Sequence, residues 1–219
     1  MTKTRGEKVT DREAAILHAA STIFNAKGYP KTSMAEIARS AGVADGTLYL
    51  YFKNKEDLVR AVLAGFYVNL TQAAQQGVDK RATTTAKMRF LARHHMRRII
   101  SNWRLLEIAP LIDRSSEQYR ESELYKLNRA YVAVFDRVAK AAIQERLVAP
   151  ETKLWVLRDM FFGAMEYSAR TMMFVHNDDD VNAYTDKLMR LILTHEKALP
   201  HYDIIDRLEN IADRLEDKF

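Results

Sequence analysis

One stretch of this chain, residues 32–55, carries polar and basic side chains at spacings that suit contact with DNA. A DNA-binding surface needs groups that anchor phosphates and a few side chains that reach the edges of bases. Thr47 suits a base edge, because its hydroxyl donates or accepts hydrogen bonds and its methyl group can touch a thymine methyl group. Lys55 stands at the start of a predicted helix, where its charge and the backbone amides can act on one phosphate together. The chemistry that this stretch predicts is the binding of a nucleic-acid duplex.

The elements that must position these side chains are two short helices joined by a glycine. Ser33 is predicted to cap the first helix, with Glu36 three residues later to complete a capping box. Gly42 follows that helix, at a position where a left-handed conformation costs glycine little. Asp45 is predicted to cap the second helix. One face of the first helix is apolar at helical spacing, through Met34, Ile37, Ala38 and Ala41. The pattern predicts a helix-turn-helix.

The amino-acid sequence of this stretch also resembles that of a known family. Residues 41–58, Ala-Gly-Val-Ala-Asp-Gly-Thr-Leu-Tyr-Leu-Tyr-Phe-Lys-Asn-Lys-Glu-Asp-Leu, resemble the DNA-binding signature of TetR/AcrR-type bacterial transcriptional regulators. Residues 16–29 resemble the first helix of the same domain, including its closing glycine. The resemblance covers residues 11–65, and beyond them only length and an all-helical pattern agree. Residues 42–53 are especially similar to the FadR-type subgroup, which regulates fatty-acid degradation and responds to acyl-CoA.

The resemblance implies a role for each residue of the motif. It implies a surface that contacts DNA, with phosphate contacts at Thr32, Ser33, Tyr51 and Lys55, major-groove contacts at Ala44, Asp45, Gly46, Thr47 and Tyr49, and Lys53 beside them. Asp45 departs from many members, which carry lysine, arginine or serine there. We expect it to cap the helix, and the alternative is acceptance of a hydrogen bond from cytosine N4. We expect Leu48 and Phe52 to lie in the core.

Length and composition predict an all-α fold. The chain has 219 residues, 47% of them hydrophobic, with only seven glycines and four prolines. We expect an N-terminal three-helix helix-turn-helix DNA-binding domain with a mobile arm (1–53), an α-helical ligand-binding and dimerisation domain (54–200) and an additional amphipathic C-terminal helix (201–219). The predicted helices are 11–27, 33–41, 45–52, 54–76, 83–101, 103–113, 116–146, 151–176, 181–197 and 203–219.

Charge and missing residue types narrow the class of protein. The net charge is +5, and residues 1–55 hold nine basic and five acidic side chains, so most of the excess lies beside the helix-turn-helix. The chain has no cysteine, which excludes disulfides, thiolate metal sites and a cysteine nucleophile. We find neither a signal peptide nor an apolar run of the roughly 18 residues that a membrane span needs, and expect a cytoplasmic protein.

The predicted body is rich in large apolar side chains that suit a ligand cavity. By the position of their helices in related regulators, the candidates for effector contact are Phe66, Phe90, Met96, Trp103, Leu106, Leu111, Tyr131, Phe135 and Phe162. The alternative for each is a dry core. Five arginines lie near them, and we expect most to form a solvated helix face, although a thioester's phosphates could use them: Arg89, Arg93, Arg97, Arg98 and Arg104. Together with this apolar body, the resemblance of residues 42–53 to the FadR-type subgroup implies a fatty acyl-CoA or fatty acid as effector.

A short recognition helix binds weakly alone, so a homodimer facing a palindromic operator is expected. The resemblance implies an interface in the last two helices of the body, with Leu157, Phe161, Met165, Leu188, Leu191 and Ile192 as candidates. These residues could instead fill the core of their own subunit. The runner-up function is a regulator of drug efflux, in which a cationic effector would be held by carboxylates at Glu107, Asp113, Asp159 or Glu166.

No catalytic or metal site is expected. His94 and His95 diverge by about 100° on a helix and cannot both face one metal. Residues 178–180, three aspartates, lack the spacing and glycine of a calcium loop and are expected to cap a helix. There is no phosphate-cradling glycine loop and no nucleophile elbow, so we expect no enzyme and no cofactor. A lipid carrier or an enzyme with a vestigial helix-turn-helix is the alternative from another class.

Overall fold

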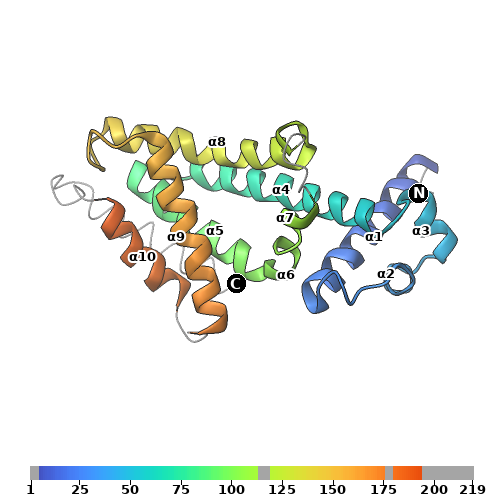
Figure 1. The fold of residues 1–219 in the computed structure, drawn as a ribbon. Coiled ribbons are helices and arrows are strands. Elements are labelled where there is room, and N and C mark those ends of the chain that lie inside the picture. The colour runs from blue at the N-terminus through green and yellow to red at the C-terminus, as the bar shows by residue number, and fades with distance from the viewer. Residues whose placement is uncertain (1–4, 113–118, 176–179, 194–219) are drawn as a thin grey trace. The chain divides into compact units, whose positions relative to one another are not determined.

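The computed structural model describes residues 5–112, 119–175 and 180–193, and every regular element in these ranges is a helix (Figure 1). The all-α prediction is confirmed. The chain forms two compact units. Unit 1 comprises residues 1–69 and 101–128, and unit 2 comprises residues 70–100 and 129–219. The predicted C-terminal helix over 203–219 lies outside the described residues.

Unit 1 contains the helix-turn-helix and a later segment of the chain. Its elements are α1 (Arg5–Lys27), α2 (Met34–Ser40), α3 (Asp45–Tyr51), the first part of α4 (Lys55–Asp79), α6 (Trp103–Leu106), α7 (Ala109–Ile112), the 3-10 turn η1 (Tyr119–Glu121) and the start of α8 (Glu123–Gln144). Unit 1 therefore extends beyond residues 1–53, the expected DNA-binding domain.

Unit 2 consists of the remaining helices. It holds the end of α4, α5 (Thr84–Ser101) apart from its last residue, most of α8, α9 (Leu154–Phe174) and α10 (Val181–Ile192). None of the helices in the described ranges has both the length and the apolar character needed to cross a membrane.

Several helix boundaries differ from the predicted ones for identifiable reasons. α1 begins at Arg5, so residues 5–10 continue the helix instead of forming a mobile arm. The helix expected over 103–113 is broken into α6 and α7. Pro110 has no amide proton to donate to the carbonyl of Leu106, which a continuous helix would require, and it is tolerated in the first turn of α7.

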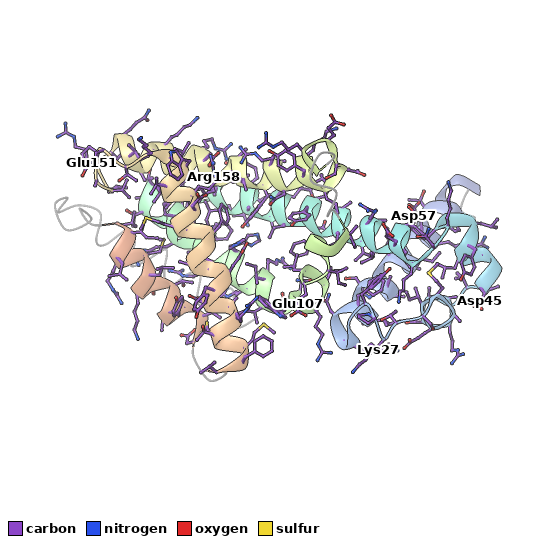
Figure 2. All side chains as sticks on the ribbon, in the orientation of Figure 1. Lys27, Asp45, Asp57, Glu107, Glu151 and Arg158 are labelled. Carbon is purple, nitrogen blue, oxygen red and sulfur yellow. The ribbon has the colours of Figure 1, made fainter. Side chains whose placement is uncertain are left out.

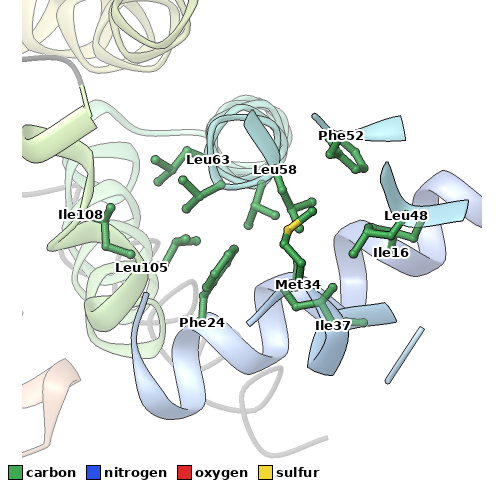
Figure 3. Packing of buried hydrophobic residues seen from close by; sticks show 14 of the residues in the cluster. Ile16, Phe24, Met34, Ile37, Leu48, Phe52, Leu58, Leu63, Leu105 and Ile108 are labelled. Carbon is green, nitrogen blue, oxygen red and sulfur yellow. The ribbon is translucent and has the colours of Figure 1, made fainter. Parts of the chain in front are cut away.

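The core of unit 1 joins the helix-turn-helix to the α6–α7 segment (Figure 3). Leu105 and Ile108 of that segment are buried in the same cluster as Phe24 of α1 and Leu63 of α4. Burial of one such side chain contributes about 1.5–3 kcal/mol. The cluster also contains Leu48 and Phe52, as predicted, together with Ile16, Met34, Ile37 and Leu58. A segment far along the chain thus completes the core beneath the helix-turn-helix.

Unit 2 has a close helix contact at its α4–α5 pair. A Cβ atom added at Gly77 would lie 1.9 Å from Cζ of Phe90, so the glycine lets the ring lie against the α4 backbone. The guanidinium of Arg81 lies 3.9 Å from the centre of that ring, and the His94 ring stacks on it at 5.4 Å. This arrangement fixes the face of α5 that turns toward α4.

Candidate functional site

The turn between α2 and α3 has the geometry that the sequence predicts. Ser33 Oγ accepts a hydrogen bond from the Glu36 amide at 3.2 Å and caps α2. The Glu36 carboxylate pairs with Lys27, so only one half of the predicted capping box is observed. Gly42 adopts φ +68°, the left-handed conformation that glycine adopts at little cost. The amide of Val43 then donates to the Ala38 carbonyl at 3.0 Å, which directs the chain into α3.

Asp45 does not cap α3, contrary to expectation. The N-cap residue is Ala44, which makes no side-chain cap bond, and Asp45 is the first helical residue. Its side chain is exposed at the tip of unit 1 (Figure 2). A carboxylate in the first turn interacts favourably with the helix dipole. Because Asp45 already lies inside the helix, its side chain does not supply the N-cap hydrogen bond. The alternative reading of Asp45, contact with a base edge, remains a prediction.

The outer face of α3 is open to solvent. Ala44, Asp45 and Gly46 are exposed, Tyr49 is 52% exposed, and Thr47 is half-buried. Leu50, which was not among the predicted contact residues, is an apolar residue that is 85% exposed. Its position was readable, because a residue two places from the buried Leu48 turns about 200° away from the core. The face therefore combines a hydroxyl, a phenol, a carboxylate and an apolar side chain.

The residues expected to anchor phosphates divide into two groups. Thr32 is only 4% exposed, and its hydroxyl donates to the Gly28 carbonyl at 2.8 Å. Lys55 Nζ donates to the carbonyls of Tyr29 and Thr32 at 2.9 and 2.8 Å and lies 4.2 Å from the centre of the Tyr29 ring. Thr32 and Lys55 thus hold the turn after α1. Ser33 and Lys53 are exposed, and Tyr51 is half-buried.

The candidates for effector contact are split between the units. In unit 1, Phe66 and Leu106 pack at the edge of the core, Trp103 is half-buried, and the side chain of Leu111 lies outside the described part. In unit 2, Phe90 packs on Gly77 and Met96 is fully buried. Among the described side chains of unit 2, three candidates are joined by ring contacts: Phe162 contacts both Tyr131 and Phe135.

Two further residues complete this cluster, which we call the aromatic cluster: His95 and Phe161. The His95 ring stacks on Tyr131 with centroids 5.6 Å apart, and it meets the edge of Phe162 at 4.8 Å. Phe135 and Phe161 pack at 4.4 Å. Tyr131 Oη lies 3.0 Å from His95 Nδ1. Burial lowers the pKa of His95 to about 3, with a smaller contribution from His94, so its ring is neutral at pH 7. The cluster is apolar apart from this one pair.

The arginines of α5 are not a solvated face. Arg89 and Arg93 are buried and pair with Asp186 of α10, at 3.3 and 3.1 Å. Arg97 donates to Asn182 Oδ1 at 2.7 Å. The expectation is therefore wrong for Arg89 and Arg93, because α10 covers the positions from which they would otherwise reach water. Arg98 of α5 is exposed, and Arg104 in α6 of unit 1 donates to the Ala26 carbonyl.

The candidates for subunit contact mostly lie inside their own subunit. Leu157, Phe161 and Met165 of α9 and Ile192 of α10 are buried, which favours the core alternative for these four. Leu188 is half-buried and Leu191 is 75% exposed. The opposite face of α9 exposes large apolar side chains seven residues apart, at Met160, Tyr167 and Phe174. Arg158 of α9 donates to both carboxylate oxygens of Asp136, at 2.8 and 2.7 Å.

The remaining polar candidates have separate surroundings. His94 Nε2 contacts the Leu70 carbonyl at 3.2 Å whereas His95 contacts Tyr131, so the two rings diverge as predicted. Asp180 caps α10 by accepting from the Asn182 amide at 2.9 Å. Among the carboxylates considered for a cationic effector, Glu107, Asp159 and Glu166 are exposed, and Asp113 is outside the described ranges. Partial desolvation by neighbouring groups raises the pKa of Glu166.

Two family models match the chain. The model for "Bacterial regulatory proteins, tetR family" matches residues 16–62, and that for "YsiA-like protein, C-terminal region" matches residues 66–199. The "Fatty acid metabolism regulator protein" of Bacillus subtilis (strain 168) is 24% identical over 179 residues, which cover 82% of this chain and 92% of the relative.

Solved structures share the fold at low sequence identity. The transcriptional regulator FadR from Bacillus subtilis, in complex with stearoyl-CoA, superposes with a TM-score of 0.69 at 24% identity, covering 83% of this chain and 97% of that one. AibR in complex with isovaleryl coenzyme A and operator DNA gives a TM-score of 0.64 at 21% identity, covering 83% and 98%. The arrangement of helices described above is therefore one that is found in transcriptional regulators.

Proposed function

The chain belongs to the tetR family of bacterial regulatory proteins, and on that premise we propose that it is a ligand-responsive repressor that binds a palindromic operator as a homodimer and is released by a fatty acyl-CoA. Its family consists of regulatory proteins, and a relative that covers most of the chain is a regulator of fatty-acid metabolism. The observation that carries the proposal is the open face of α3 beyond a turn closed by Gly42. A helix held in this way can enter the major groove.

DNA contact on this proposal combines two kinds of group. Thr47 and Tyr49 on α3 read base edges, with Asp45 as an acceptor for cytosine N4. Ser33 and Lys53 are exposed where they can meet phosphates, and Tyr51 contributes its phenol. Thr32 and Lys55 act through the turn that they hold. The contact surface thus comprises Ala44, Asp45, Gly46, Thr47, Tyr49, Tyr51, Ser33 and Lys53.

A homodimer gives two such helices the spacing of one DNA turn, about 34–36 Å. The exposed apolar face of α9, formed by Met160, Tyr167 and Phe174, supports a partner interface there, with Leu191 of α10. Large exposed apolar patches of this kind mark interaction surfaces. In this proposal Leu157, Phe161, Met165 and Ile192 support the interface from inside their own subunit.

The effector class is supported by the relatives and by the chemistry of unit 2. One structural relative holds stearoyl-CoA and another holds isovaleryl coenzyme A. The aromatic cluster offers apolar surface to an acyl chain, and methionines such as Met96 can repack around it.

Coupling between effector and DNA is proposed to run through α4, which contributes residues to both units. An effector that binds one placement of this helix better than another changes the distance between the two helix-turn-helix motifs of the dimer, so that they no longer match the operator. Such coupling typically amounts to about 1–3 kcal/mol. Within unit 1, α6 is tied to α1 by Leu105 in the core and by the bond from Asn25 Nδ2 to Asn102 Oδ1 at 3.2 Å, which gives a second route.

The test is a titration of the purified protein, on a DNA fragment from upstream of its own gene, with palmitoyl-CoA. Fluorescence anisotropy of the DNA reports release, and the emission of Trp103 and Trp155 reports binding of the thioester. Release of DNA at micromolar thioester is the expected result. Operator affinity that stays unchanged when palmitoyl-CoA is bound would contradict the proposed coupling.

A further inference from the structure

Nε2 of His95 is one of several buried side-chain polar atoms that have no hydrogen-bond partner in the described part of unit 2. His95 is 7% exposed, and its Nε2 atom makes no hydrogen bond within the described part of the chain. Its other ring nitrogen, Nδ1, is paired with Tyr131 Oη. An unsatisfied buried polar group costs about 1–3 kcal/mol, so a native structure that keeps one has a reason for it.

The pairing with Tyr131 decides what Nε2 can do. A phenol is a stronger donor than acceptor, and a neutral imidazole nitrogen is a strong acceptor, so Tyr131 donates to Nδ1. The proton of the neutral ring then lies on Nε2, as assigned from this hydrogen bond. Nε2 is therefore a donor that points into apolar surroundings and requires an acceptor.

The neighbours of His95 define the chemistry of that acceptor. Its ring contacts the rings of Tyr131, Phe161 and Phe162, which supply no cation and no second donor besides the Tyr131 hydroxyl already used. A carboxylate placed here would be desolvated without a counter-charge. A neutral carbonyl oxygen needs a single donor and carries apolar groups with it.

Phe162 also indicates how such a group reaches the ring. It is the half-buried member of the aromatic cluster, whereas His95, Tyr131, Phe135 and Phe161 are buried. Phe162 is consequently the member of the cluster past which a ligand would approach His95. The next residue, Gly163, adds no side chain, and nothing lies within 4 Å of a Cβ built there.

We propose that His95 Nε2–H donates a hydrogen bond to the thioester carbonyl oxygen of a bound acyl-CoA, with Tyr131 holding the ring in the required tautomer. The inference deepens the proposed function and rests on it. It makes His95 the residue that distinguishes a thioester from an equally long chain without a carbonyl group.

The test compares two ligands that differ by one oxygen atom. Palmitoyl-CoA has the thioester carbonyl, and S-hexadecyl-CoA is the thioether without it. We expect the wild-type protein to bind palmitoyl-CoA about tenfold more tightly, the value of one buried hydrogen bond. The dissociation constants are measured by calorimetry or by the fluorescence of Trp103 and Trp155.

Matched variants assign the preference to Nε2. His95→Asn keeps a group near Nδ1 for Tyr131 and removes Nε2, so it should bind both ligands with equal affinity. His95→Gln places an amide donor near Nε2 and should recover part of the preference. His94→Asn is the control on the same helix, because that ring faces Leu70, and it should keep the tenfold preference.

Each outcome decides a different claim. Equal wild-type affinity for the two ligands overturns the role of His95 but leaves an acyl-CoA regulator intact, and this arm needs no variant to fold. An unchanged preference in His95→Asn, with its melting temperature measured alongside, also overturns it. Binding of neither ligand contradicts the acyl-CoA effector of the proposed function and removes the inference with it.

Discussion

The helix-turn-helix of unit 1 and helix α5 of unit 2 are both rich in basic residues, yet the structure uses those residues in opposite ways. Arg39 and Lys53 of unit 1 are exposed, where a polyanion can meet them. Arg89 and Arg93 of α5 are buried and share Asp186 of a helix almost a hundred residues later. The contrast has one exception on each side: Lys55 of unit 1 donates to the carbonyls of Tyr29 and Thr32, and Arg98 of α5 is exposed.

The largest expected effect comes from removing the carboxylate that α10 supplies to α5. Asp186→Ala leaves two buried guanidinium groups without that counter-charge and should lower the free energy of unfolding by about 3–5 kcal/mol. Urea unfolding measures this. Asp159→Ala, which removes an exposed acid on α9, is the matched control and should stay within about 0.5 kcal/mol. Equal effects would mean that the α5 arginines behave like surface charges after all.

Acid should lower the stability of unit 2, because His95 is buried there as a neutral ring. The pKa of His95 is lowered to about 3 from 6.5, so the unfolded chain binds a proton that the folded one excludes between these values. Stability is complete above pH 6.5 and falls as the pH decreases, by about 2 kcal/mol from this residue at pH 5. His94, lowered to about 4, adds in the same direction. Urea midpoints between pH 7.5 and 5 should fall less steeply in His95→Asn, and identical slopes would contradict the prediction.

Alanine substitutions at the two glycines of the helix-turn-helix should distinguish an effect on backbone conformation from an effect on DNA contact. Gly42→Ala places a side chain at φ +68° and should cost about 1–2 kcal/mol of stability. Gly46→Ala meets nothing within 4 Å in a helix and should leave stability equal or higher. Thermal unfolding distinguishes them. If Gly46→Ala weakens operator binding while the protein stays stable, the outer face of α3 is the contact surface.

The smallest predicted effect concerns single exposed cations. Lys53→Ala should weaken DNA binding to all sequences alike and reduce the salt dependence by about one unit of slope. Lys187→Ala, an exposed lysine of α10, should change neither. Binding isotherms at several salt concentrations give both slopes. A reduced slope in Lys187→Ala would place part of the DNA contact on unit 2.

Local features of unit 1 could be predicted because their causes lie within a few residues. The left-handed Gly42, the Ser33 cap and the burial of Leu48 each follow from nearby spacing and turn chemistry. Asp45 is the local exception. Its residue type suits a cap, but the extended conformation that defines the N-cap falls on Ala44, one residue earlier.

In unit 2 several side-chain partners are distant in sequence, and the sequence did not predict those pairings. The helical period shows that α5 has an apolar face, but not that Asp186 would cover Arg89 and Arg93. It likewise marks Leu157 and Phe161 as apolar without saying whether they face the core or a partner. The pairing of His95 with Tyr131, 36 residues apart, has no counterpart in any spacing.

The sequence by itself determined the all-helical class and the helix-turn-helix, since both depend on periodicity and short-range turn chemistry. The residue identities of 41–58 carried the family resemblance. Only the tertiary structure decided which polar side chains are surface groups and which are internal partners. The physical reason is that burial depends on what packs against a helix from elsewhere in the chain, and a one-dimensional pattern does not contain that information.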